Sequence, residues 1–162
     1  MAGKHQNHKG SGTNTLCLHN TPKWGSYKDG TQKWRAYVYG AEYEPDDGSG
    51  KNLVPGLVPR STDDQIAPCT VCRLKLQREI LMIPGTTECS TGWTKEYDGH
   101  LMAPRSDVSA GEFLCIDRKA DIIAGGKNSN QFSLYPTEAK CGSLLCPPYV
   151  DGRELTCVVC SG

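Results

Sequence analysis

The chain has 162 residues, of which 37% are apolar, and 18 basic residues balance 18 acidic ones. The basic residues form no block, which argues against a nucleic-acid partner, and no stretch approaches the roughly 20 apolar residues of a membrane-spanning helix. Nine cysteines, 18 glycines and 10 prolines indicate a loop-rich domain that is stabilised by disulfides. Because such domains belong to oxidising compartments, we expect the protein to be extracellular.

The expected elements are short β-strands separated by glycine, proline, asparagine or aspartate. In chain order, runs that favour strands cover residues 34–39, 79–83, 113–116, 131–135 and 155–159. No window sustains a helical period, so helix should be limited to a turn or two. Residues 44–67 are expected to form one long loop. The predicted fold class is all-β or β-rich, with long loops and disulfide stabilisation.

Two parts of the chain carry the same landmarks in the same order. Each part ends in a Cys-x-x-Cys pair, Cys69 with Cys72 and Cys157 with Cys160. The earlier landmarks are Met1-Ala2, Leu16-Cys17 and Tyr39–Glu42 in the first half, and Met102-Ala103, Leu114-Cys115 and Tyr135–Glu138 in the second. This order predicts an internal duplication. The expected lobes are residues 1–85 and 86–162, packed as one compact unit.

The two halves differ at their beginnings. Residues 86–99 open the second half and contain Cys89, whereas the first half starts directly at Met1. If Cys89 pairs with Cys115, the equivalent partner of Cys17 is missing, so Cys17 is the expected unpaired cysteine. A lost opening segment would also account for the absent signal peptide, so we expect a truncated chain, an alternative start or a piece of a longer protein. Spacing leaves the connectivity open. The disulfide candidates are Cys69, Cys72, Cys89, Cys115, Cys141, Cys146, Cys157 and Cys160.

The most specific block of the sequence is the cysteine-rich ending, residues 141–160. This block resembles the ending of secreted invertebrate proteins that are called short-chain collagen C4-like. The same resemblance covers residues 15–18, 39–43, 67–72, 81–84 and 92–97. Members of that family begin with a segment that contains an Arg-Trp-Gly motif and a further cysteine, and this chain lacks both. The resemblance implies secretion and a disulfide-rich domain without established activity. The domain is non-collagenous, because glycine does not recur at every third position.

The cysteine pairs also suggest metal chemistry. Two Cys-x-x-Cys elements together suit tetrahedral zinc, but their separation is much longer than in a compact zinc ribbon. A thioredoxin-like role requires an activated thiol at the start of a helix, whereas Val158 and Val159 favour a strand. Disulfides are therefore the favoured state, and neither a metal nor another cofactor is expected. No catalytic motif is present, so we expect a protein that is not an enzyme.

Four aromatic residues, Trp24, Trp34, Trp93 and Tyr97, lie beside glycine or polar residues. Such a setting is typical of glycan or peptide sites, although aromatic side chains in small domains more often pack in the core. Three functions follow as hypotheses. The first is a structural or assembly module of extracellular matrix or secretion, with itself or matrix components as partners. The alternatives are a lectin-like binder of glycans and a thiolate metal-binding protein.

Overall fold

The computed structural model describes residues 1–46, 64–75, 77–126 and 131–162. Within these ranges no residue is helical, and the regular structure consists of short strands. The strands are β1 (Ala2–Gly3), β2 (Tyr39–Tyr43), β3 (Ile80–Pro84), β4 (Thr94–Ala103), β5 (Leu114–Asp117), β6 (Phe132–Pro136) and β7 (Thr156–Ser161). Together with four disulfides, they confirm the prediction of a β-rich, disulfide-stabilised fold.

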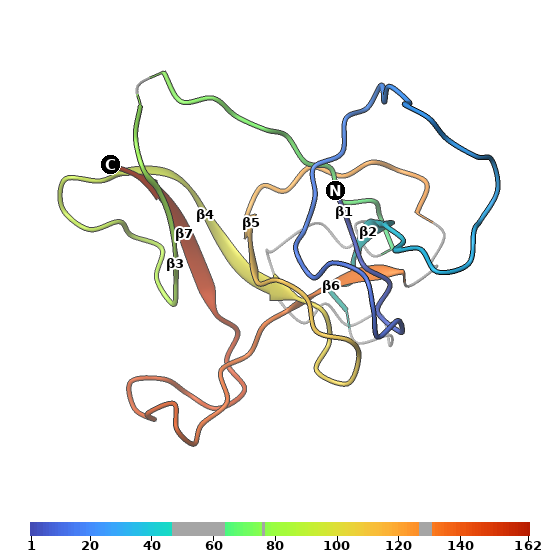
Figure 1. Cartoon of the computed structure of the whole chain (residues 1–162). Coiled ribbons are helices and arrows are strands. Elements are labelled where there is room, and N and C mark those ends of the chain that lie inside the picture. The colour runs from blue at the N-terminus through green and yellow to red at the C-terminus, as the bar shows by residue number, and fades with distance from the viewer. Residues whose placement is uncertain (47–63, 76, 127–130) are drawn as a thin grey trace.

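The strands form a mixed sheet in the order β1-β2-β6-β4-β7-β3, and β5 pairs with β4 outside this path. β2 runs parallel to β6, and the other named pairs are antiparallel. Figure 1 shows β3, β7 and β4 side by side, while β6, β2 and β1 gather near the far end of β4. The long strand β4 therefore links the two groups of strands.

Four of the predicted strands are confirmed, because β3, β5, β6 and β7 fall on the expected runs with small shifts. The prediction of a strand over residues 34–39 is wrong, since β2 starts only at Tyr39. Trp34 has a φ of 62°, in the left-handed region that a strand does not use. Strand β4 was not predicted at all. Most of the expected loop, residues 47–63, lies outside the described residues.

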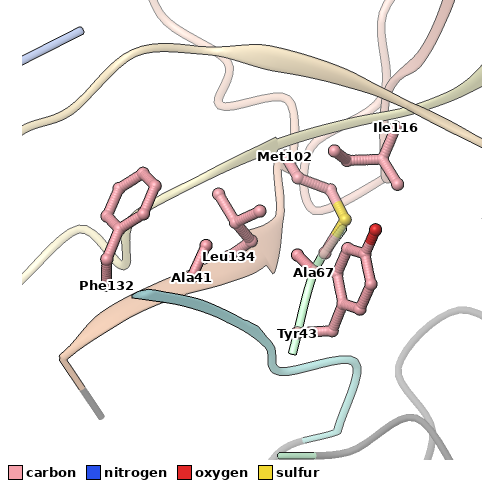
Figure 2. Close-up of a cluster of buried hydrophobic side chains, with 7 residues drawn as sticks. All are labelled: Ala41, Tyr43, Ala67, Met102, Ile116, Phe132 and Leu134. Atoms are coloured by element: carbon pink, nitrogen blue, oxygen red, sulfur yellow. The ribbon is translucent and has the colours of Figure 1, made fainter. Parts of the chain in front are cut away.

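One hydrophobic cluster takes its side chains from both expected lobes. Its buried members are Ala41, Tyr43, Ala67, Met102, Ile116, Phe132 and Leu134. Figure 2 shows these side chains gathered between β2, β4 and β6. In addition, β3 belongs to the expected first lobe but pairs with β7 of the second. Both the core and the sheet therefore join the two halves.

Candidate functional site

The disulfides are the main chemical feature of the molecule. Cys17 is bonded to Cys69, Cys89 to Cys160, Cys115 to Cys157, and Cys141 to Cys146. Three of these bonds join residues that are 52, 71 and 42 positions apart in the sequence. Crosslinks between distant positions restrict the unfolded chain strongly, and this is the main way in which disulfides stabilise small domains.

The cysteine framework differs from the expected one. The prediction that Cys17 is unpaired is wrong, because it is bonded to Cys69. Cys72, a disulfide candidate, is instead the free cysteine, and it is exposed. The conditional pairing of Cys89 with Cys115 is also wrong. Both Cys115 and Cys157 lie on strands that pair with β4, which brings their Cα atoms to 5.7 Å from each other.

Strand β7 is the most strongly anchored element of this framework. Its two cysteines, Cys157 and Cys160, are completely buried and both are bonded to other elements. β3 pairs along one edge of β7 and β4 along the other. Cys160 lies between Leu81 of β3 and Lys95 of β4. A strand with two paired neighbours and two crosslinks leaves few backbone groups for further partners.

The free thiol lies in a different environment. Cys72 is exposed, and burial of Tyr97, followed by the neighbouring Asp117 and Cys72, raises the pKa of Tyr97. The Tyr97 hydroxyl donates a hydrogen bond to the Cys115 carbonyl oxygen at 3.0 Å. Tyr97 is thus a half-buried residue of β4 whose side chain reaches across to β5. Its hydroxyl is already engaged and does not point freely at a ligand.

The structure does not bring the four predicted aromatic residues together as one site. Trp24 and Trp34 lie in the loop between β1 and β2 and are 76% and 95% exposed. Trp93 immediately precedes β4, and its ring packs close to Gly162. Tyr97 therefore belongs to the sheet and Trp93 lies beside it, while Trp24 and Trp34 belong to an exposed loop. The loop pair offers the more widely exposed rings.

The loop between β1 and β2 contains an open hollow of about 800 Å³. Tyr27, Lys28, Gln32, Arg35 and Tyr37 are among the residues that line it. The Gln32 amide donates to the carbonyl oxygens of Asp29 and Gly30, and the Tyr37 hydroxyl donates to the Gln32 carbonyl oxygen. These bonds give the loop a defined turn. Tyr27 was not among the predicted aromatic residues, although it follows Trp24 closely in a similarly polar stretch.

A second polar cluster lies on the first half. The rings of His5 and His8 stack at 4.3 Å, and Tyr39 contacts both of them edge-on. Burial and the neighbouring His8 lower the pKa of His5. The Nδ1 atom of His5 accepts a hydrogen bond from the backbone of Asn7 at 3.1 Å. The pair therefore packs on β2, and both of its Nδ1 atoms are engaged, that of His5 by Asn7 and that of His8 by the Tyr39 hydroxyl at 3.5 Å.

Metal ligation finds little support among the cysteines. Disulfides occupy three of the four Cys-x-x-Cys sulfurs, so these elements do not form a four-thiolate site. In the described parts of the chain, no three histidine, cysteine, aspartate or glutamate side chains are grouped so that they could hold a metal ion. The same parts contain no helix long and apolar enough to span a membrane.

The chain was also compared with known proteins. No family model, no curated protein and no solved structure matches it. The resemblance to the collagen C4-like proteins therefore remains a prediction from the sequence.

Proposed function

We propose that this protein is a secreted, non-enzymatic structural module of extracellular matrix or secretion. The observation that carries the proposal is the disulfide framework, in which eight of the nine cysteines are paired. Stable disulfides are a feature of oxidising compartments and are rare in the cytosol. Four crosslinks on a fold with a small apolar cluster are typical of a protein selected for durability outside the cell.

The physical basis of this durability is the distribution of the crosslinks. One bond ties β7 to β5, another ties β7 to the segment between β3 and β4, and a third ties Cys17 to Cys69 in the first half. Among the residues that the structure describes, the buried apolar ones are few and several are alanines, so hydrophobic burial there contributes less than in an average domain. The disulfides supply the difference by making the unfolded chain less favourable.

Thiol titration of the protein from its natural source tests the compartment. Denatured protein without reductant should show no more than one thiol for each chain, and reduction should raise the number to nine. Extraction of the source tissue should recover the protein with the matrix or secreted fraction. Eight or more thiols without reductant, or recovery with the cytosolic fraction, would contradict the proposal.

Glycan binding is a second candidate, and the exposed loop between β1 and β2 favours it. Trp24 and Trp34 expose their rings widely, and Lys28 and Arg35 line the hollow beside Tyr27. Aromatic faces stack on sugar rings, and the two cations would suit an acidic polysaccharide. This candidate is compatible with a matrix role, because acidic polysaccharides are common matrix components.

A glycan array with the intact protein tests the second candidate. Binding to acidic glycans should be lost in the double variant Trp24→Ala/Trp34→Ala. It should persist in Leu145→Ala, which removes an exposed apolar side chain elsewhere on the surface. No reproducible binding by the unaltered protein, or equal binding by both variants, would refute a site in this loop.

A further inference from the structure

A closed ring of backbone hydrogen bonds occurs twice in the molecule. In the first ring, the Met1 amino group donates to Ala67, the Ala67 N–H donates to Ala41, and the Ala41 N–H donates to Met1, at 2.8, 2.9 and 3.1 Å. In the second ring, Leu101 donates to Leu155, Leu155 to Thr137, and Thr137 to Leu101, at 2.9, 2.8 and 2.9 Å. The direction of every bond is the same in both rings. Ala67 therefore has its counterpart in Leu155.

The correspondence extends beyond the rings. Another pair of backbone bonds is repeated at Tyr43 and Ala139, which lie two residues after the ring members Ala41 and Thr137. The first half has Tyr43 N–H to Gln65 and Asp64 N–H to Tyr43, and the second has Ala139 N–H to Arg153 and Gly152 N–H to Ala139. Isolated pairings also agree, since Glu42 lies opposite Ile66 and Glu138 lies opposite Glu154. The two halves thus share a common backbone pattern.

The disulfides follow the same correspondence. Ala2 pairs with Leu16, and Met102 pairs with Leu114. Cys17 follows Leu16 and is bonded to Cys69, two residues after Ala67. Cys115 follows Leu114 and is bonded to Cys157, two residues after Leu155. The Cys17–Cys69 and Cys115–Cys157 bonds are therefore equivalent.

This equivalence identifies the counterpart of the free cysteine. Cys72 lies five residues after Ala67, as Cys160 lies five residues after Leu155. Cys160 is buried, lies between β3 and β4, and is bonded to Cys89. Cys72 is exposed and is the cysteine that has no such partner. Cys160 thus has a disulfide partner, and the equivalent Cys72 has none.

The backbone around Cys72 is open as well. We call residues 68–73 the open stretch, because none of their N–H or C=O groups forms a backbone hydrogen bond with another described residue. Val71 is 84% exposed, whereas its counterpart Val159 pairs with Met82 on one side and Tyr97 on the other. Unpaired backbone groups in an extended stretch are a template for an added strand. This observation is independent of the thiol.

We infer that the open stretch is a docking site for an extended, cysteine-bearing segment of a second polypeptide. That segment adds to residues 68–73 as a β-strand, as β4 adds to β7, and its cysteine bonds to Cys72 as Cys89 bonds to Cys160. Main-chain hydrogen bonds supply affinity in this mode of recognition, and the disulfide makes it lasting. The inference deepens the proposed matrix function and rests on it for the oxidising setting that a lasting disulfide requires.

The bond forms by thiol–disulfide exchange. The Cys72 thiolate attacks the sulfur of the incoming cysteine while that cysteine is bonded to glutathione. The new bond joins Cys72 to the segment, the bond to glutathione breaks, and glutathione leaves as a thiolate that takes up a proton. No net oxidation occurs, because one disulfide is exchanged for another.

The test uses the full oxidised chain and a peptide with the sequence of residues 86–100. In the folded protein this segment contains Cys89 and the part of β4 that pairs with β7. The peptide is supplied as the mixed disulfide between Cys89 and glutathione. A peptide of the same composition with a shuffled sequence around its cysteine is the matched control, and Cys72→Ser is the control protein.

We expect the peptide to crosslink to Cys72 at least several-fold faster than the shuffled peptide, and Cys72→Ser to give no crosslink. Hydrogen exchange of the amides of residues 69–73 should slow on crosslinking, because a paired strand protects them and a simple thiol adduct does not. Equal rates for the two peptides would overturn the inference. So would unprotected amides, or products limited to glutathionylated Cys72 or a dimer through Cys72. The assay uses purified protein, so a cytosolic origin would refute the proposed function without affecting this result.

Discussion

Gly99 shows how closely the backbone packs at the centre of the sheet. It is buried on β4, where it lies opposite Asp117 of β5 and Cys157 of β7. A Cβ atom placed on Gly99 would overlap the carbonyl oxygen of Ile116. The glycine is therefore needed for close approach between strands and not for an unusual turn. A side chain at this position would have to push β5 away.

Replacing Gly99 with alanine should destabilise the fold by about 1–3 kcal/mol, the usual cost of forcing an extra carbon into a packed site. The free energy of unfolding from guanidinium titrations measures this effect. Gly40→Ala is the matched control, because Gly40 also lies on a strand but has no atom within 4 Å of the added Cβ. Equal stability of the two variants would contradict the close approach.

Tyr43 is the residue at which packing and ionisation are most clearly coupled. Its side chain is 3% exposed in the core cluster, and burial, followed by the charges of Asp121 and Asp117, raises its pKa to about 12. An unfolded tyrosine ionises near pH 10. Between these values the folded state keeps a proton that the unfolded state releases, so stability decreases as the pH rises from about 10 to 12.

The expected loss across this window is about 2–3 kcal/mol for a shift of two pKa units. Denaturation midpoints measured from pH 9 to 11 should therefore fall less steeply in Tyr43→Phe than in the unaltered protein. Tyr27→Phe changes an exposed ring and should keep the original slope. A Tyr43→Phe variant with an unchanged slope would exclude Tyr43 as the source of the pH dependence.

At the scale of elements, the disulfides differ in how much of the chain they restrain. The Cys115–Cys157 bond closes 42 positions between two strands, while Cys141–Cys146 closes only five in an exposed segment. The entropy of loop closure grows with the logarithm of loop length, so the long crosslink should contribute more. The two bonds form a natural pair for comparison.

By the loop-entropy relation, Cys115→Ala/Cys157→Ala should lose about 4 kcal/mol and Cys141→Ala/Cys146→Ala about 2 kcal/mol. Thermal and guanidinium unfolding of the two double variants, each with its remaining cysteines oxidised, measures the difference. The reverse order would show that loop length does not control stability here. The loss of a buried sulfur pair at Cys115–Cys157 would add to the larger effect.

The sequence predicted those elements whose apolar residues are continuous. Residues such as Met82 and Ile83 in β3 or Val158 and Val159 in β7 favour strands on their own. β4 was not predicted because it contains Lys95, Glu96 and Gly99, which do not favour a strand. Its strand conformation depends on pairing with β7, β5 and β6. The aromatic run at residues 34–38 shows the opposite case. Its composition favours a strand, but no strand in the described part of the chain pairs with it.

At the scale of the whole molecule, the cysteine pairing could not be predicted from the sequence, and the internal duplication stays a prediction. Two of its landmarks have similar partners, since Glu42 pairs with Ile66 and Glu138 with Glu154, and Cys17 and Cys115 are each bonded to the first cysteine of a Cys-x-x-Cys pair. The Met-Ala landmark does not follow the predicted alignment, because Ala2 pairs with Leu16 whereas Met102, not Ala103, pairs with Leu114. The cysteine pairing, and with it the identity of the free cysteine, depends on the order of the strands in the sheet. For example, β5 and β7 both pair with β4, and this brings Cys115 and Cys157 together. Spacing along the chain does not contain that order.

The parallel pairing of β2 with β6 has a consequence for how the chain reaches this state. It pairs Ala41 with Phe132. The disulfide with the greatest sequence separation joins Cys89 to Cys160. Much of the folded structure therefore depends on contacts between residues that are distant in the sequence. Such high contact order makes folding slow. Nine thiols allow on the order of a thousand alternative pairings during this time. Correct folding should therefore depend on a disulfide isomerase, and yields from a host without one should be dominated by misbridged chains.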